Sequence, residues 1–106
     1  MRFSTYLNNV KCMEWKINAQ QGVLVDTLFQ ISEKMETEIV NGEKYYHITK
    51  ERIIEEIPMF FSEIDTIYRN LKLLHEKNII KYMKKKKRDY IKITEKGKEW
   101  LKWNTL

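Results

Sequence analysis

Apolar residues along the chain recur mostly at spacings of three and four, which predicts a series of amphipathic helices. The first stripe predicts a helix over roughly residues 3–17, although Trp15 falls off it. A second helix is predicted to run from Asn18 to about Met35, since Asn18 favours the N-cap position and Gln21 stands at the capping-box position. The apolar positions of the two stripes are Phe3, Tyr6, Leu7, Val10, Met13 and Ile17, then Val23, Leu24, Leu28 and Ile31.

The pattern changes after residue 36, where aromatic and β-branched residues replace the helical spacing. Asn41-Gly42 is a strong turn signal, and the segment from Tyr45 to Ile48 suits a short strand. Ile39-Val40 could pair with that strand across the turn, which predicts a hairpin.

Two further helices are predicted in succession. Thr49 is expected to cap a short helix that Pro58 ends, because proline lacks an amide donor. Ser62 is expected to cap a helix over 62–77, and Asn78 suits the left-handed position that follows it. The predicted buried stripe of this second helix consists of Ile64, Ile67, Tyr68, Leu71 and Leu74.

The last quarter predicts a hairpin and a final helix. Two strand-like phrases, "IIKYM" and "DYIKI", flank the five cations from Lys84 to Arg88. This loop holds no glycine and no Asn-Gly pair, so we expect it to be longer than a two-residue turn and mobile. Thr94 is expected to cap the final helix, over 94–106.

These elements predict one domain of the mainly α class with a small β-hairpin. A short helix, a turn, a capped second helix and a basic hairpin form the order of a winged helix-turn-helix. The winged-helix core is expected over 18–93, with a helical extension at 1–17 and a C-terminal helix at 94–106.

Charge is distributed unevenly along the chain. Residues 1–80 carry 10 Lys and Arg against 12 Asp and Glu, whereas residues 81–106 carry 10 against 3. A cationic segment of this kind favours a polyanionic partner, most commonly a phosphate backbone. No apolar stretch is long enough for a membrane span, and a lone Cys12 fits a reducing compartment, so we expect a cytoplasmic protein without a membrane partner.

The sequence offers no candidate for catalysis, and we expect neither an enzyme nor a cofactor. Cys12, His47 and His75 are scattered and lack the paired spacing of a zinc site. The adjacent carboxylates of Glu55 and Glu56 point to different helix faces, and no glycine-rich phosphate loop is present.

Several phrases resemble winged-helix DNA-binding proteins. "SEIDTIYRNLKLLHEKNIIKY" resembles a recognition helix and first wing strand, and "ITEKGKEW" is similar to the phrase after the wing in regulators of the multiple-antibiotic-resistance type. "EEIPMFFSEIDTIYRNLKLLHEKNII", with "MEWKINAQQGVLVDTLF" upstream, is most similar to phage-type and replication-associated winged-helix proteins. The resemblance covers about residues 13–100.

This resemblance implies a transcriptional or replication regulator that binds double-stranded DNA. The helix over 62–77 would enter the major groove, and the wing would contact the phosphate backbone. The implied base contacts are Ser62, Asp65, Thr66, Arg69 and Asn70, and the implied backbone contacts are Lys50, Lys84, Lys85, Lys86, Lys87 and Arg88.

A second interpretation stays open, because residues 50–77 carry five cations against six anions. Under it, the fold is a protein–protein interaction module of a phage replication or regulatory complex, with Leu73 in the contact. Trp100 and Trp103 are expected to pack rather than to stack on bases, against Phe3, Tyr6 and Val10. The two terminal helices would then pack together in one chain or across a homodimer.

Overall fold

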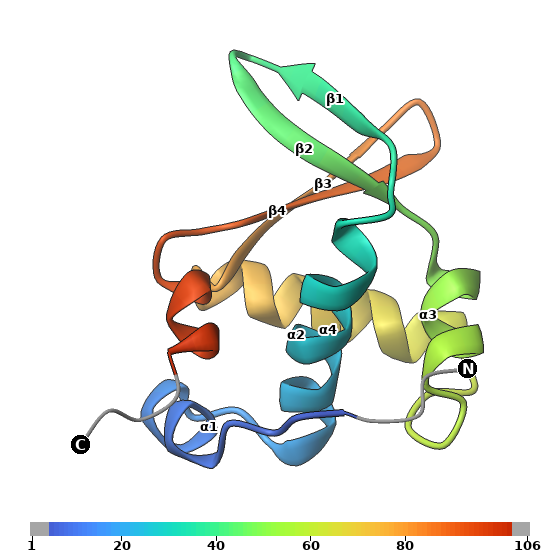
Figure 1. The fold of residues 1–106 in the computed structure, drawn as a ribbon. Helices are drawn as coiled ribbons and strands as arrows, with labels where there is room; N and C mark the ends of the chain where they lie inside the picture. Colours follow the sequence, from blue (N-terminus) through green and yellow to red (C-terminus); the bar gives the residue numbers. More distant parts are fainter. Residues whose placement is uncertain (1–4, 103–106) are drawn as a thin grey trace.

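The computed structural model describes residues 5–102, so Phe3 and Trp103 lie outside the described residues. The helices lie together below a sheet whose two hairpins point away from them (Figure 1). The helices are α1 (Asn9–Trp15), α2 (Ala19–Ser32), α3 (Lys50–Glu56), α4 (Ile64–Glu76) and the short 3-10 helix η1 (Gly97–Leu101). The strands are β1 (Thr37–Val40), β2 (Glu43–Ile48), β3 (Ile80–Lys85) and β4 (Arg88–Ile93).

Helix α2 is the centre of the domain. Asn18 accepts a hydrogen bond from the Gln21 amide, and the Gln21 side chain accepts one from the Asn18 amide, which confirms the predicted capping box. Every residue from Gly22 to Leu28 is buried, because the helix is covered on several sides. The predicted apolar residues of α2 all belong to the main core.

The predicted mainly α class is wrong, because the described residues contain a four-stranded antiparallel sheet of order β1-β2-β4-β3. The first hairpin, which Asn41-Gly42 indicated, is present with Val40 opposite Glu43. Its strand β2 also pairs with β4, so both hairpins join into one sheet. Strands that each look short in the sequence therefore join into one sheet, which forms a second layer beside the helices.

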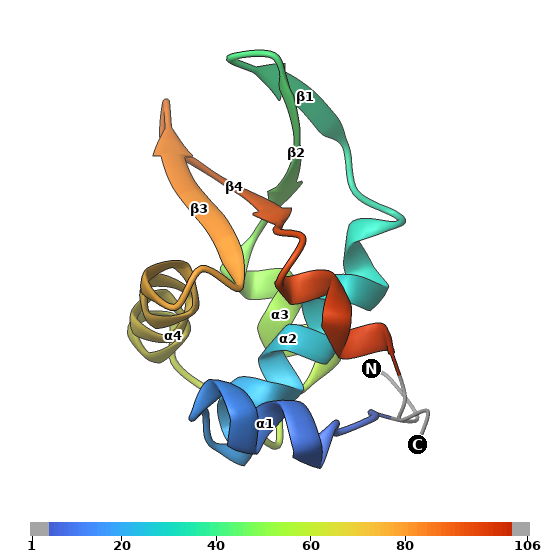
Figure 2. The ribbon, with the colours of Figure 1, turned by 90° about the vertical axis from the view of Figure 1, so that its left-hand side faces the viewer.

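The two hairpins pair with each other only at their base. Residues Tyr46–Ile48 pair with Asp89–Ile91, and beyond them the hairpins separate toward their turns (Figure 2). A small apolar cluster of Val40, Tyr45 and Tyr90, with Met83 against it, packs on the sheet apart from the main core.

The apolar stripe predicted for the first helix is right only toward its ends, where Ile17 belongs to the core and Leu7 packs against it. Helix α1 begins only at residue 9, because Asn8 caps it by accepting a hydrogen bond from the Lys11 amide. Val10 and Met13 are 56% and 81% exposed, whereas Cys12 and Trp15 are buried against α2. The predicted stripe joined residues that do not share one helix.

The end of the described chain closes the core, as a short 3-10 helix rather than the predicted longer α-helix. Trp100 is completely buried, stacks on Trp15 with ring centroids 6.1 Å apart, and donates to Asp26 Oδ1 at 3.2 Å. The terminal segments thus pack together within one chain through Trp15, whereas Val10 of the predicted contact is exposed.

Candidate nucleic-acid interface

Helices α3 and α4 stand where the sequence predicted two successive helices. Thr49 Oγ1 accepts from the Arg52 amide and caps α3, as expected. The expected cap at Ser62 is wrong by one residue: Glu63 is the extended N-cap residue, and its side chain makes no capping hydrogen bond. Asn78 has a φ of 61° after α4, as predicted for a residue that tolerates the left-handed region.

The exposed face of α4 separates the predicted base contacts into two groups. Ser62, Asp65 and Arg69 are exposed, and the guanidinium of Arg69 lies 3.5 Å from Thr66 Oγ1. Asn70 is half-buried and already engaged, since it donates to the Thr66 carbonyl and accepts from the Gln21 side chain. Of the predicted base contacts, Arg69 therefore combines an exposed position with the longest side chain. Asn70 instead holds α4 against α2.

The basic hairpin ends in a tight turn, and the prediction of a loop longer than two residues is wrong. Lys85 pairs with Arg88, which leaves Lys86 and Lys87 as the two turn residues, with φ values of 51° and 65°. Two-residue turns with positive φ at both positions match the twist of antiparallel strands. Strand pairing through Lys85 and Arg88 thus imposes a turn that the residues themselves disfavour.

The five cations from Lys84 to Arg88 are all exposed, but they face different sides of the hairpin. Lys84 lies on the same strand face as Tyr82, whose ring packs edge-on against Tyr68 of α4 at 6.1 Å. Lys85 lies on the opposite face, with Nζ 3.6 Å from a Glu38 oxygen. The hairpin therefore offers Lys84 on the side of α4, and its turn offers Lys86 and Lys87 at the tip.

Lys50, predicted to contact the DNA backbone, is buried instead. Its Nζ lies 2.8 Å from Asp89 Oδ2 and 5.4 Å from the centre of the Tyr68 ring. Asp89 also accepts from the Tyr82 hydroxyl at 2.6 Å. An ammonium group in this environment is committed to its carboxylate, so Lys50 is a structural residue of the hairpin base and not part of the exposed surface.

Tyr82, which is half-buried, contacts the same ion pair. Burial raises the pKa of its phenol well above the ordinary value, and the hydrogen bond to Asp89 raises it further. Its backbone amide donates to Nδ1 of His75, the last basic residue of α4. Tyr82 thus fastens the hairpin to α4, and both views place α4 beside β3 (Figures 1 and 2).

One cation of this surface, Lys72, was not predicted from the sequence. Its Nζ lies over the ring of Tyr68, 5.4 Å from the centroid, and Tyr68 is partly exposed rather than buried as predicted. The spacing of four residues between Tyr68 and Lys72 was the available signal, because residues four apart are neighbours on a helix. The exposed cations on α4 and on the hairpin face toward it are thus Arg69, Lys72 and Lys84, and the turn adds Lys86 and Lys87.

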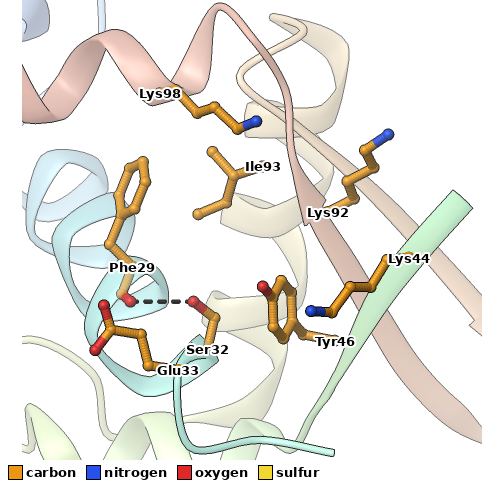
Figure 3. Close-up of a pocket in the computed structure, with 8 residues that line it drawn as sticks. All are labelled: Phe29, Ser32, Glu33, Lys44, Tyr46, Lys92, Ile93 and Lys98. Atoms are coloured by element: carbon orange, nitrogen blue, oxygen red, sulfur yellow. Dashed lines mark hydrogen bonds between the residues drawn. The ribbon is translucent and has the colours of Figure 1, made fainter. Parts of the chain in front are cut away.

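A separate cavity of about 310 Å³ opens on another side of the domain (Figure 3). It lies where β2 and β4 separate over the end of α2, and Ser32 on its floor donates to the Phe29 carbonyl. Two of its lysines have anionic partners, Glu43 for Lys92 and Glu95 for Lys98. The lining residues are Phe29, Ser32, Glu33, Lys44, Tyr46, Lys92, Ile93 and Lys98.

Within residues 5–102, no helix is long and apolar enough to cross a membrane. The same part of the chain gathers no group of three or more His, Cys, Asp or Glu side chains suited to a metal ion. Comparisons of the chain with protein-family models, with curated proteins and with solved structures found no match.

Proposed function

We propose that this protein is a double-stranded DNA-binding regulator of transcription or replication. Helix α4 would present Arg69 to the major groove, and the turn of the β3–β4 hairpin would hold the phosphate backbone. No catalytic step is part of the proposal, since occupancy of DNA is sufficient for regulation of this kind.

The observation that carries the proposal is the tight turn at Lys86-Lys87. It holds exposed cations on a hydrogen-bonded strand pair rather than on a loose loop. Ordering a flexible lysine-rich loop on DNA would cost conformational entropy, and a turn that is already formed reduces that cost. The attachment of Tyr82 to α4 adds support, because it fixes the hairpin relative to the proposed recognition helix.

Binding of a random-sequence duplex, followed by fluorescence anisotropy at several salt concentrations, tests the proposal. We expect the variant K84A/K86A/K87A to bind more weakly and to lower the slope of log K against log salt by about 2 to 3. The control K34A/K98A/K102A removes the same charge elsewhere and should keep most of the affinity and slope.

Arg69→Ala tests the major-groove contact separately. It should lower affinity for a selected sequence more than affinity for random duplex, because base contacts carry the sequence preference. Absence of any wild-type binding at low salt would contradict the proposed function.

A second candidate, a protein-interaction module, is favoured by the surface at the turn before α4. Met59 is 91% exposed, and Phe60 and Ile64 are partly exposed beside the acidic Glu63 and Asp65. Exposed apolar side chains that cluster often mark contacts with other proteins, and the two carboxylates would repel phosphates. Leu73, which the protein-interaction hypothesis also places in the contact, is half-buried.

A further inference from the structure

Two glutamates of the β1–β2 hairpin bind the cations on one face of the basic hairpin. Glu43 accepts from Lys81 at 3.1 Å and from Lys92 at 3.2 Å. Glu38 lies 3.6 Å from Lys85 and accepts from the Tyr90 hydroxyl at 3.2 Å.

These contacts all lie on the sheet face that points away from α4. Side chains alternate along a strand, so Lys81 and Lys85 stand opposite to Tyr82, which packs on Tyr68 of α4. Lys92 pairs with Lys81 in the strand register and shares its face. One face of the hairpin is thus partly compensated, with two carboxylates against its three lysines and Arg88. The face toward α4 and the turn carry exposed cations outside these ion pairs.

These ion pairs are expected to add little to the stability of the fold. The side chains of Lys81, Lys85 and Glu38 are each close to half exposed, and exposed ion pairs contribute little to folding. Their larger effect is on the electric field outside the protein, which steers polyanions toward uncompensated cations.

We propose that Glu38 and Glu43 restrict the DNA-binding surface to the α4 side of the hairpin, by withholding Lys81, Lys85 and Lys92 from phosphates. The inference rests on the proposed DNA-binding function and adds to it which face of the β3–β4 hairpin meets the duplex. With both carboxylates present, a duplex that met the outer face of the sheet would find three lysines already bound to carboxylates, with Arg88 as the fourth cation of that face. The duplex therefore engages the face on which Arg69 can reach its bases.

The test compares the wild-type chain with E38Q/E43Q in binding to random-sequence duplex. Glutamine keeps the side-chain shape and removes the charge. We expect E38Q/E43Q to bind random duplex at least several-fold more tightly, with a salt slope steeper by about 1 to 3, since up to three lysines become available for phosphates. The matched control is E95Q/E99Q, which also removes two ion-paired carboxylates, those bound to Lys98 and Lys11.

Protection of lysines from acylation by bound DNA gives the second readout. In the wild-type chain, DNA should protect Lys84, Lys86 and Lys87 and leave Lys81 and Lys92 reactive. In E38Q/E43Q, DNA should protect Lys81 and Lys92 as well. Circular dichroism and thermal unfolding of each variant report that the fold is retained.

The outcomes separate the two proposals. Wild-type binding together with an unchanged affinity and slope in E38Q/E43Q overturns the role of the glutamates and leaves the DNA-binding function standing. An equal gain in E95Q/E99Q also overturns it, because the effect would then be one of net charge. Failure of both the wild-type chain and E38Q/E43Q to bind at low salt overturns the DNA-binding function, and the role of the glutamates with it.

Discussion

Lys50 and Asp89 form a buried ion pair, with 2.8 Å between Nζ and Oδ2, that joins the first residue of α3 to the second residue of β4. The pair connects the helix-turn-helix segment to the basic hairpin across 39 residues of sequence. It therefore contributes to the fixed placement of the hairpin next to α4, on which the proposed interface depends.

Breaking this pair should destabilise the domain strongly. We expect Lys50→Met and Asp89→Asn each to lower the free energy of unfolding by about 3 kcal/mol, because either change leaves a buried polar partner uncompensated. The double variant should lose less than the sum of the two. Urea denaturation measures these losses.

The control for this prediction is Arg52→Ala, which removes a partly exposed pair with Glu56. Its loss should stay below about 1 kcal/mol. A loss of similar size in Lys50→Met would contradict the assigned importance of the buried pair.

Exchanging the residues of the two hairpin turns should have opposite effects on the stability of the domain. Asn41-Gly42 and Lys86-Lys87 both have positive φ at both positions, but only the first pair favours that conformation. Replacing Lys86-Lys87 with Asn-Gly should stabilise the domain by about 1 kcal/mol and weaken DNA binding, because it relieves backbone strain and removes two cations.

The reciprocal exchange, Asn41-Gly42 to Lys-Lys, should destabilise the domain by a similar amount. Thermal unfolding of both variants checks the pair of predictions. If the Asn-Gly variant of the basic hairpin unfolded more easily than the wild-type chain, the assignment of strain at Lys86 and Lys87 would be wrong.

Gly22 lies where α2 packs closely against Cys12 of α1. A Cβ atom there would lie 2.6 Å from Cys12 Sγ and from Leu7 Cδ1. Gly22→Ala should therefore destabilise the domain by about 1 to 3 kcal/mol through overpacking, although alanine is the better helix former. Adding Cys12→Ala should recover part of this loss in urea denaturation, and no recovery would show that the contact with Cys12 is not the cause.

Glu43 gives the stability of the sheet a pH dependence. Hydrogen bonds from Lys81 and then Lys92 hold the pKa of its carboxyl below the ordinary value of 4.5. A carboxyl whose pKa is lowered on folding stabilises the folded state above that ordinary value, and the contribution is lost as pH falls through the lower folded value. The carboxylate should therefore stay ionised and bound to its lysines at pH 5.

An NMR titration of the glutamate side-chain carbons measures this pKa directly. Lys81→Met should move it back toward the ordinary value, whereas Lys98→Met, which removes the partner of Glu95, should leave it in place. A titration midpoint of Glu43 at or above 4.5 would contradict the prediction.

The sequence predicted the elements whose signals are local. Asn18, Thr49 and Asn78 marked helix boundaries correctly, because caps depend on hydrogen bonds within a few residues. Asn41-Gly42 identified its hairpin for the same reason. Each of these residues prefers, by itself, the conformation that it adopts.

The sequence could not predict features that depend on distant partners. Lys50 had the sequence signal of a surface cation, because its buried carboxylate partner, Asp89, lies 39 residues away in the β3–β4 hairpin. Lys86 and Lys87 adopt a turn that pairing of the flanking residues imposes. The side of α1 that is buried depends on where Trp100 packs, and no spacing within residues 9–15 encodes that position.

The position of Trp100 has a consequence for synthesis of the chain. Its indole and its backbone carbonyl bond to Asp26 and Asn8, contacts that span 74 and 92 residues of sequence. Helices α1 and α2 emerge from the ribosome first, yet the side chains that contact Trp100 lack this partner until residue 100 has been made. The native core can therefore form only after nearly the whole described chain is available, and until then the surface that receives Trp100 is exposed to chaperones.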